Sequence, residues 1–254
     1  MPSMRAYVIL LSLFFGGFEL HAFTLTTSTG VKLPDPNVKV VIAGNNCDAA
    51  GFNSANALAE MVKESVDEYW NRISTCALEL EVTGADSGVN TSSDTLIEAL
   101  EKTPLGTILV GCSDNAALFA SSSTLGVGSI NTVSGDRGVL LLNNRDTTFA
   151  NLEAQEKLAV IAHELGHAFG LGHSSQAAAL MYFSVGGKVQ KKLSIDDYDA
   201  CTYLYPKDAP GGCGTVAFVD DGNSSGASGG LLTLFFGLGL MLISARLKSW
   251  KSFY

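Results

Sequence analysis

The sequence has 254 residues, of which 46% are hydrophobic and 16% are charged. This composition excludes a disordered chain, and the length suits one domain of ordinary size between two ends of different composition. The formal net charge is −9, although residues 231–254 hold three basic side chains and no acidic ones. The rest of the chain is therefore more acidic still, which argues against nucleic acid as a partner.

The N-terminal residues 1–22 are typical of a secretory signal peptide. Arg5 precedes an apolar run at residues 6–15, which is too short to span a bilayer, and a small residue, Ala22, ends the segment. We expect cleavage after Ala22, with a retained N-terminal anchor as the alternative. The few residues between this cut and the first predicted strand leave no room for a folded prodomain.

A helix and five strands are predicted between residues 38 and 142. The helix covers residues 54–73, where apolar side chains recur every three or four positions, and Asn53 or Ser54 can cap it. Short alternating or β-branched runs predict strands at residues 38–42, 78–82, 107–111, 127–130 and 139–142.

Two more helices complete the predicted domain. One covers residues 152–169 with Asn151 as its cap, and the other covers residues 195–204. Ser194 and Asp197 have the spacing of a capping box at the start of the second. This order predicts an α+β fold, in the form of an α/β sandwich with a mixed but mostly parallel five-stranded sheet and two long helices.

The segment His163-Glu-Leu-Gly-His167-Ala-Phe-Gly-Leu-Gly-His173 carries the chemistry. His163 and His167 are four residues apart on a helix, so their rings share one face and can hold one ion. Gly170 can stop the helix in a left-handed conformation, and Gly172 allows a second tight step. The chain can therefore bring His173 back as a third ligand.

Three neutral imidazoles leave a fourth position open, as at a catalytic zinc. Glu164 is then placed to act as the general base that takes a proton from water. Apart from His21 in the predicted signal peptide, every histidine of the chain lies in this segment. Histidines scattered through a core or a surface would not be arranged in this way.

This motif resembles that of the metzincin metalloproteases, and within them the matrixins. Residues 138–206 carry the resemblance, including Ser174 directly after the third histidine and a Met-turn at Ala179-Leu-Met181-Tyr. The resemblance implies a zincin-like fold with an active-site helix, the Met-turn and a C-terminal helix. It implies that Met181 forms an apolar floor under the zinc, where ordinary core packing is the alternative.

The resemblance also implies two further features. Asp196 and Asp197 brace the Met-turn from behind the ligands, unless they simply begin a solvated helix. Substrate lies extended along an antiparallel edge strand, expected here near residues 124–131. The chain departs from the family in having Phe183 where a proline usually follows Met-Tyr. It also has no cysteine switch.

The metal content expected from this pattern is one zinc ion. No histidine is left for the second, structural zinc that is common in animal matrixins. Calcium is compatible with the acidic loops, but the sequence assigns no calcium site.

Five cysteines occur, at positions 47, 76, 112, 201 and 213. In an exported protein they are expected to form disulfides and to leave one thiol over, with buried free thiols as the alternative. Fifteen arrangements of two bridges are open. We favour Cys201–Cys213, because a short Pro/Gly-rich loop separates the two residues.

The C-terminal part is predicted to have three segments. Residues 207–230 form a Gly/Ser-rich linker, residues 231–245 a short apolar helix, and residues 246–254 a basic cytoplasmic tail. Fifteen helical residues rise only about 22 Å, so the span is short for a bilayer. The arrangement resembles bacterial sorting tags of the GlyGly type, and a permanent membrane anchor is the alternative.

Together these features predict an exported zinc metalloendopeptidase. It would be a monomer at the cell surface or outside the cell that hydrolyses peptide bonds of proteins or peptides. One alternative is a catalytically silent zinc-binding surface module with the same fold, although the intact Glu164 argues against it. Another is a surface adhesin in which the protease domain is incidental, but no additional domain is present to adhere with.

Overall fold

The computed structural model describes residues 23–183 and 192–207. The predicted signal peptide, the linker after residue 207, the apolar segment 231–245, the basic tail and Cys213 lie outside the described residues. Within the described ranges no helix is both long and apolar enough to cross a bilayer.

The core of the structure is a five-stranded sheet with the strand order β2-β1-β3-β5-β4. The pairs β1–β2, β1–β3 and β3–β5 are parallel, whereas β4 pairs antiparallel with β5 and forms one edge. The mixed, mostly parallel sheet is therefore confirmed. The strands are β1 (Asn37–Ala43), β2 (Glu79–Asp86), β3 (Thr107–Ser113), β4 (Gly126–Ile130) and β5 (Gly138–Asn143).

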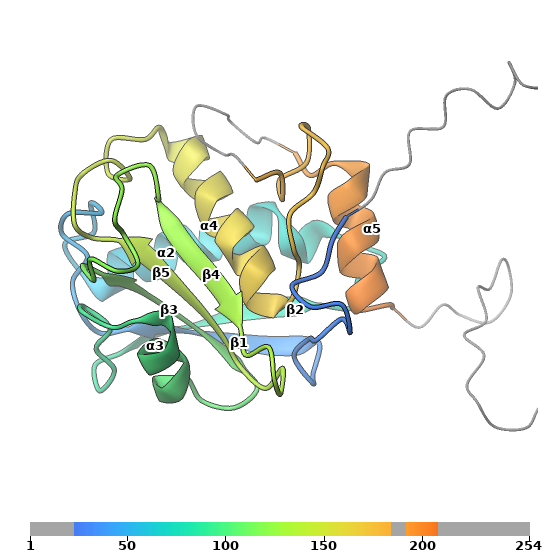
Figure 1. The fold of residues 1–254 in the computed structure, drawn as a ribbon, viewed down its shortest axis with the longest axis horizontal. Helices are drawn as coiled ribbons and strands as arrows, with labels where there is room; N and C mark the ends of the chain where they lie inside the picture. The colour runs from blue at the N-terminus through green and yellow to red at the C-terminus, as the bar shows by residue number, and fades with distance from the viewer. Residues whose placement is uncertain (1–22, 184–191, 208–254) are drawn as a thin grey trace, which may run out of the picture. The chain divides into compact units, whose positions relative to one another are not determined.

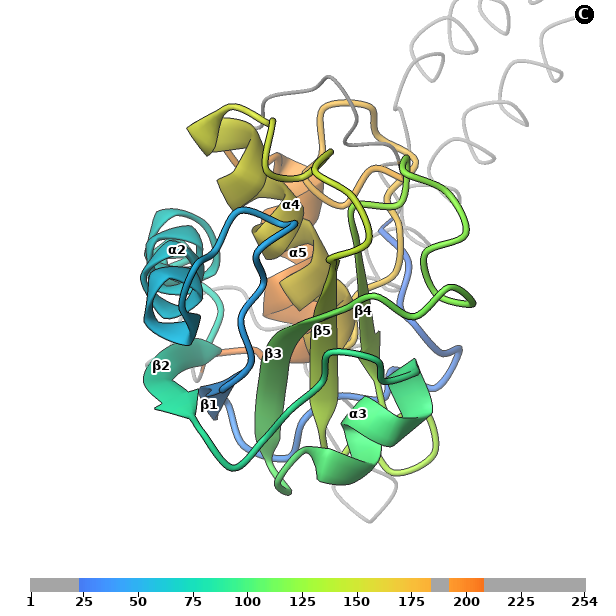
Figure 2. The same cartoon turned by 90° about the vertical axis from the view of Figure 1, so that its left-hand side faces the viewer.

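Helices cover both faces of this sheet (Figures 1 and 2). The two long helices pack on one face, where alternate strand residues such as Val40, Val110 and Leu140 form the larger core with them. The intervening strand residues, such as Leu109 and Leu141, face a shorter helix on the other side. The helical elements are α2 (Ala55–Glu68), the 3₁₀ turn η1 (Trp70–Arg72), α3 (Leu96–Lys102), α4 (Ala154–Phe169) and α5 (Ile195–Leu204).

The helix ends confirm some predicted caps and correct another. Ser54 caps α2, and the capping box of Ser194 with Asp197 begins α5 as predicted. Helix α4 begins two residues later than predicted, because Asn151 belongs to the preceding turn, where its amide donates to the Thr147 carbonyl. Glu153 caps α4 instead.

Two glycines of the sheet allow α4 to lie unusually close to it. A Cβ atom on Gly128 of β4 would overlap the carbonyl oxygen of Glu164, and one on Gly138 of β5 would overlap that of Ala168. Because neither glycine carries a side chain, the backbone of α4 approaches the edge of the sheet directly. This contact sets the distance between the sheet and α4, the helix that carries His163 and His167.

The disulfides differ from the predicted pairing. The structure joins Cys47 to Cys112 and Cys76 to Cys201, with Cα–Cα distances of 5.8 and 5.7 Å. The predicted Cys201–Cys213 bridge is therefore wrong. Cys201 lies on the buried face of α5, directed at the segment after η1, so its partner is distant in sequence rather than in the next loop.

Candidate metal centre

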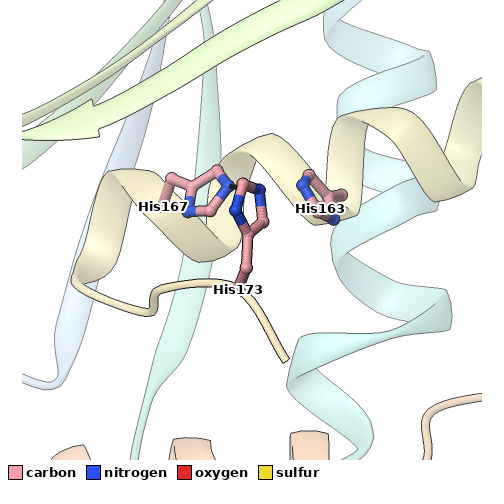
Figure 3. A group of neighbouring side chains, drawn as sticks. All are labelled: His163, His167 and His173. Carbon is pink, nitrogen blue, oxygen red and sulfur yellow. Dashed lines mark hydrogen bonds between the residues drawn. The ribbon is translucent and has the colours of Figure 1, made fainter. Parts of the chain in front are cut away.

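The three histidines of the motif converge on one point (Figure 3). His163 and His167 project from successive turns of α4, and His173 returns from the loop after the helix. One ring nitrogen of each lies within 4.8 Å of the others, and the Nε2 atoms of His167 and His173 are 3.2 Å apart. Gly170, with φ of 119°, ends the helix in the left-handed conformation and allows this return.

Two backbone carbonyls fix how the helical histidines are protonated. The Nδ1 of His163 lies 2.8 Å from the carbonyl oxygen of Leu180, and that of His167 lies 2.8 Å from the carbonyl oxygen of Leu171. A carbonyl only accepts, so each Nδ1 carries the proton and donates it. Each Nε2 therefore presents a lone pair, which is the form of imidazole that ligates a metal.

The electrostatics of the site favour neutral imidazoles. Burial lowers the pKa of His163 and of His167 to about 4 in each case. Both rings are therefore uncharged near pH 7. Three histidine ring nitrogens gathered at one point match the donor set of a zinc site that keeps a position open, so the residues present fit zinc.

Glu164 lies beside the histidines in the same cleft. The cleft has a volume of about 600 Å³ and is bordered by β4, the three histidines and Phe183. The Oε2 atom of Glu164 accepts a hydrogen bond of 2.7 Å from the backbone N–H of Gly128. Burial raises the pKa of the Glu164 carboxyl, while His167 and the Gly128 N–H act in the opposite direction.

The Met-turn lies directly behind α4. The side chain of Met181 is buried against Gly166, where any Cβ atom would collide with its sulfur. The N–H of Ser174 donates to the Met181 carbonyl at 2.7 Å, which connects the turn to the residue after the third histidine. The position of Met181 beneath a bound metal stays a prediction.

The two aspartates predicted behind the site differ in their contacts. Asp197 accepts hydrogen bonds from the backbone N–H groups of Leu180 and Met181, at 2.8 and 3.0 Å. The buried carboxylate of Asp196 makes no hydrogen bond among the described residues. The contacts that brace the Met-turn are therefore made by Asp197 and not by Asp196.

Sequence reasoning missed three contributors to the site. The carbonyls of Leu171 and Leu180 orient His167 and His163, and the amide of Gly128 binds Glu164. All three act through backbone atoms, so their side chains give no signal. The glycines of β4 were the one available indication, because a strand interior rarely contains glycine without a close neighbour.

Comparison with known proteins agrees with this geometry. The family model described as matrixin (Peptidase M10) matches residues 67–206, which is more than half of the chain. Metalloendoproteinase 1-MMP of Arabidopsis thaliana is 46% identical over 48 residues, or 18% of this chain and 13% of that protein.

Two further plant proteins are similar. Metalloendoproteinase 1 of Glycine max is 46% identical over 48 residues, covering 18% of this chain and 16% of that protein. Metalloendoproteinase 2-MMP of Arabidopsis thaliana is 34% identical over 71 residues, covering 28% and 19%. The chain thus matches less than a fifth of the length of each of these relatives.

Proposed function

Since the chain belongs to the matrixin family of metalloproteases, we propose that it is a zinc-dependent metalloendopeptidase with Glu164 as its general base. The observation that carries this proposal is the convergence of one ring nitrogen from each of three histidines beside a carboxylate in one cleft. Its substrates would be proteins or peptides outside the cytoplasm.

The histidines would hold the metal, and the chain's other groups would handle the proton and the substrate. A zinc ion at this position supplies a Lewis acid that makes a bound water more acidic and polarises the scissile carbonyl. Glu164 takes a proton from the attacking water and passes it to the leaving amine. Burial raises the pKa of this carboxyl, which makes its carboxylate a stronger base toward the water.

The edge strand β4 supports binding of an extended peptide. Leu125 and Asn131, which flank the strand, bond to the β5 side through their backbone. The alternating pattern of an antiparallel pair therefore turns the backbone groups of residues 126, 128 and 130 away from β5. A peptide could pair by strand addition with these groups other than the N–H of Gly128, which donates to Glu164.

Two disulfides support a location outside the cytoplasm. Such bonds persist in oxidising compartments and are rare in the reducing cytosol. The signal peptide at residues 1–22 and the membrane segment at residues 231–245 stay predictions from the sequence.

The decisive experiment compares Glu164→Ala and Glu164→Gln with the unchanged protein, using Glu60→Gln, an exposed change on α2, as the control. Zinc per chain is measured together with cleavage of casein or a quenched fluorescent peptide. We expect both Glu164 variants to keep their zinc and to lose about 10²- to 10⁴-fold in kcat. Equal cleavage by all four proteins would overturn the assignment. Zinc binding without any cleavage by the unchanged protein would support a silent zinc-binding module instead.

A further inference from the structure

Residues 23–26, here called the N-terminal strap, lie along the loop that carries the third histidine. The N–H of Thr26 donates to the Gly170 carbonyl at 3.0 Å, and the N–H of Gly172 donates to the Thr24 carbonyl at 2.8 Å. Leu25 and Leu171 form an antiparallel bridge between these bonds. A segment about 145 residues away in sequence thus pairs with the loop like a short strand.

The two threonine side chains of the strap bond to the residues that orient the ligands. The hydroxyl of Thr24 donates to the carbonyl of His173 at 2.7 Å. The hydroxyl of Thr26 donates at 3.0 Å to the carbonyl of Leu171. This is the same oxygen that accepts the Nδ1 proton of His167. The strap therefore contacts the backbone behind two of the three histidines.

The absence of a side chain at Gly172 is explained by the strap. The sequence predicted a tight backbone step here, but Gly172 is not among the described glycines with positive φ. A Cβ atom on Gly172 would instead collide with the hydroxyl of Thr24. Gly172 is thus required for the close approach of the strap.

The strap has its own attachment to the domain. The ring of Phe23 lies 5.5 Å from that of Tyr203 on α5, measured between centroids. Phe23 and Leu25 are half-buried and pack against the main core. Alternate residues, Thr24 and Thr26, are left free to direct their hydroxyls at the loop.

We propose that the N-terminal strap positions the metal ligands, with Thr24 and Thr26 as the positioning residues. The proposal rests on the metal site of the proposed function. His173 is exposed, so the packing of its own side chain does not fix its position. The hydrogen bonds from the strap to the backbone of its loop hold it instead. Groups that orient metal ligands from behind commonly change metal affinity by about 10- to 100-fold when they are removed. The predicted cleavage after Ala22 would leave the strap whole.

The test compares full chains that carry matched substitutions. Thr24→Val with Thr26→Val removes both hydroxyls at nearly constant shape, and Thr24→Ser with Thr26→Ser restores them. Thr29→Val is the control, because among the residues that the structure describes its hydroxyl bonds only to that of Thr27. The zinc dissociation constant is measured by chelator competition, and the urea midpoint of the metal-free protein is measured alongside it.

We expect the double valine protein to bind zinc about tenfold more weakly at an unchanged urea midpoint, and the double serine protein and the control to bind normally. Gly172→Ala should weaken zinc binding in the same direction, because it displaces Thr24. Normal zinc affinity in the double valine protein would overturn the proposal, as would weakening that the serines do not reverse. Because the readout is zinc binding, a protein that binds zinc tightly but cleaves nothing would refute only the proposed function. A protein that binds no zinc at all would refute both.

Discussion

Replacing Asp197 by asparagine should destabilise the domain and weaken its metal site together. The buried carboxylate accepts four hydrogen bonds, from the N–H groups of Leu180, Met181 and Ser194 and from the Ser194 hydroxyl, at 2.7–3.0 Å. Asparagine keeps one acceptor oxygen, which would best remain on the side where three donors meet. Its NH₂ group would then face the N–H of Met181, donor against donor.

The expected magnitude follows from these bonds. A buried N–H without an acceptor costs about 1–3 kcal/mol, and the remaining three bonds lose the strength that the negative charge gives them. We expect the free energy of unfolding to fall by about 3–5 kcal/mol, a large part of the stability of an ordinary domain. Because the Leu180 carbonyl orients His163, zinc affinity should fall by about tenfold as well.

The assay is urea unfolding of the metal-free protein, followed by chelator competition for zinc. Asp199→Asn is the matched control, since Asp199 is exposed on the same helix. If Asp197→Asn unfolds within about 0.5 kcal/mol of the unchanged protein and binds zinc as tightly, the connection from α5 through the Met-turn to the ligands is refuted.

Three further results are expected. Gly128→Ala should cost about 1–3 kcal/mol in urea unfolding, because its Cβ atom would push α4 away from β4, whereas Gly126→Ala should cost less because it meets a movable side chain at 3.0 Å. The metal-free protein should gain stability as the pH rises from about 4 to 6.5. The pKa of His163 is about 4 in the folded state and 6.5 in the unfolded chain, so the unfolded chain binds more protons in that window. The free energy of unfolding therefore rises by about 3 kcal/mol from this residue, and urea midpoints at several pH values would show it. Cys76→Ser with Cys201→Ser should lower the unfolding free energy by about 4–5 kcal/mol, since the bridge closes a long loop; an unchanged urea midpoint would contradict this.

The parts of the site that lie within one helix could be predicted from the sequence. The convergence of the His163 and His167 rings needs only the four-residue spacing of a helix, and the turn at Gly170 needs only the freedom of glycine. The capping box of Ser194 and Asp197 is equally local. These features were correct because each depends on neighbours in the chain.

Helix α3 was missed, although its sequence contains a signal. Thr95 and Glu98 form a capping box at its start. The helix is only seven residues long, and Ala99 is its one fully buried residue, so no apolar stripe marks it. Periodicity detects a helix through the face that it buries, and this helix buries little through its own side chains.

The disulfides could not be predicted for a different reason. The two bridges span 65 and 125 residues. Cys76 meets Cys201 because the segment after η1 runs beside the end of α5, where the N–H of Ala77 donates to the Tyr205 carbonyl. Spacing along the chain contains no information about such a contact, so choosing the nearest cysteine was not a sound rule.

The same distinction separates the identity of the ligands from their orientation. The motif predicts which residues bind the metal, but the direction of the lone pairs on His167 and His163 depends on the carbonyls of Leu171 and Leu180. Any residue type supplies a carbonyl, so no side chain in the sequence marks these two. Distant groups bond to both: the Thr26 hydroxyl donates to the Leu171 carbonyl, and Asp197 accepts from the Met181 N–H, which shares a peptide unit with the Leu180 carbonyl. A related chain could therefore keep all three histidines and Glu164 and still bind zinc weakly, if it lacked the groups that hold those two carbonyls in place.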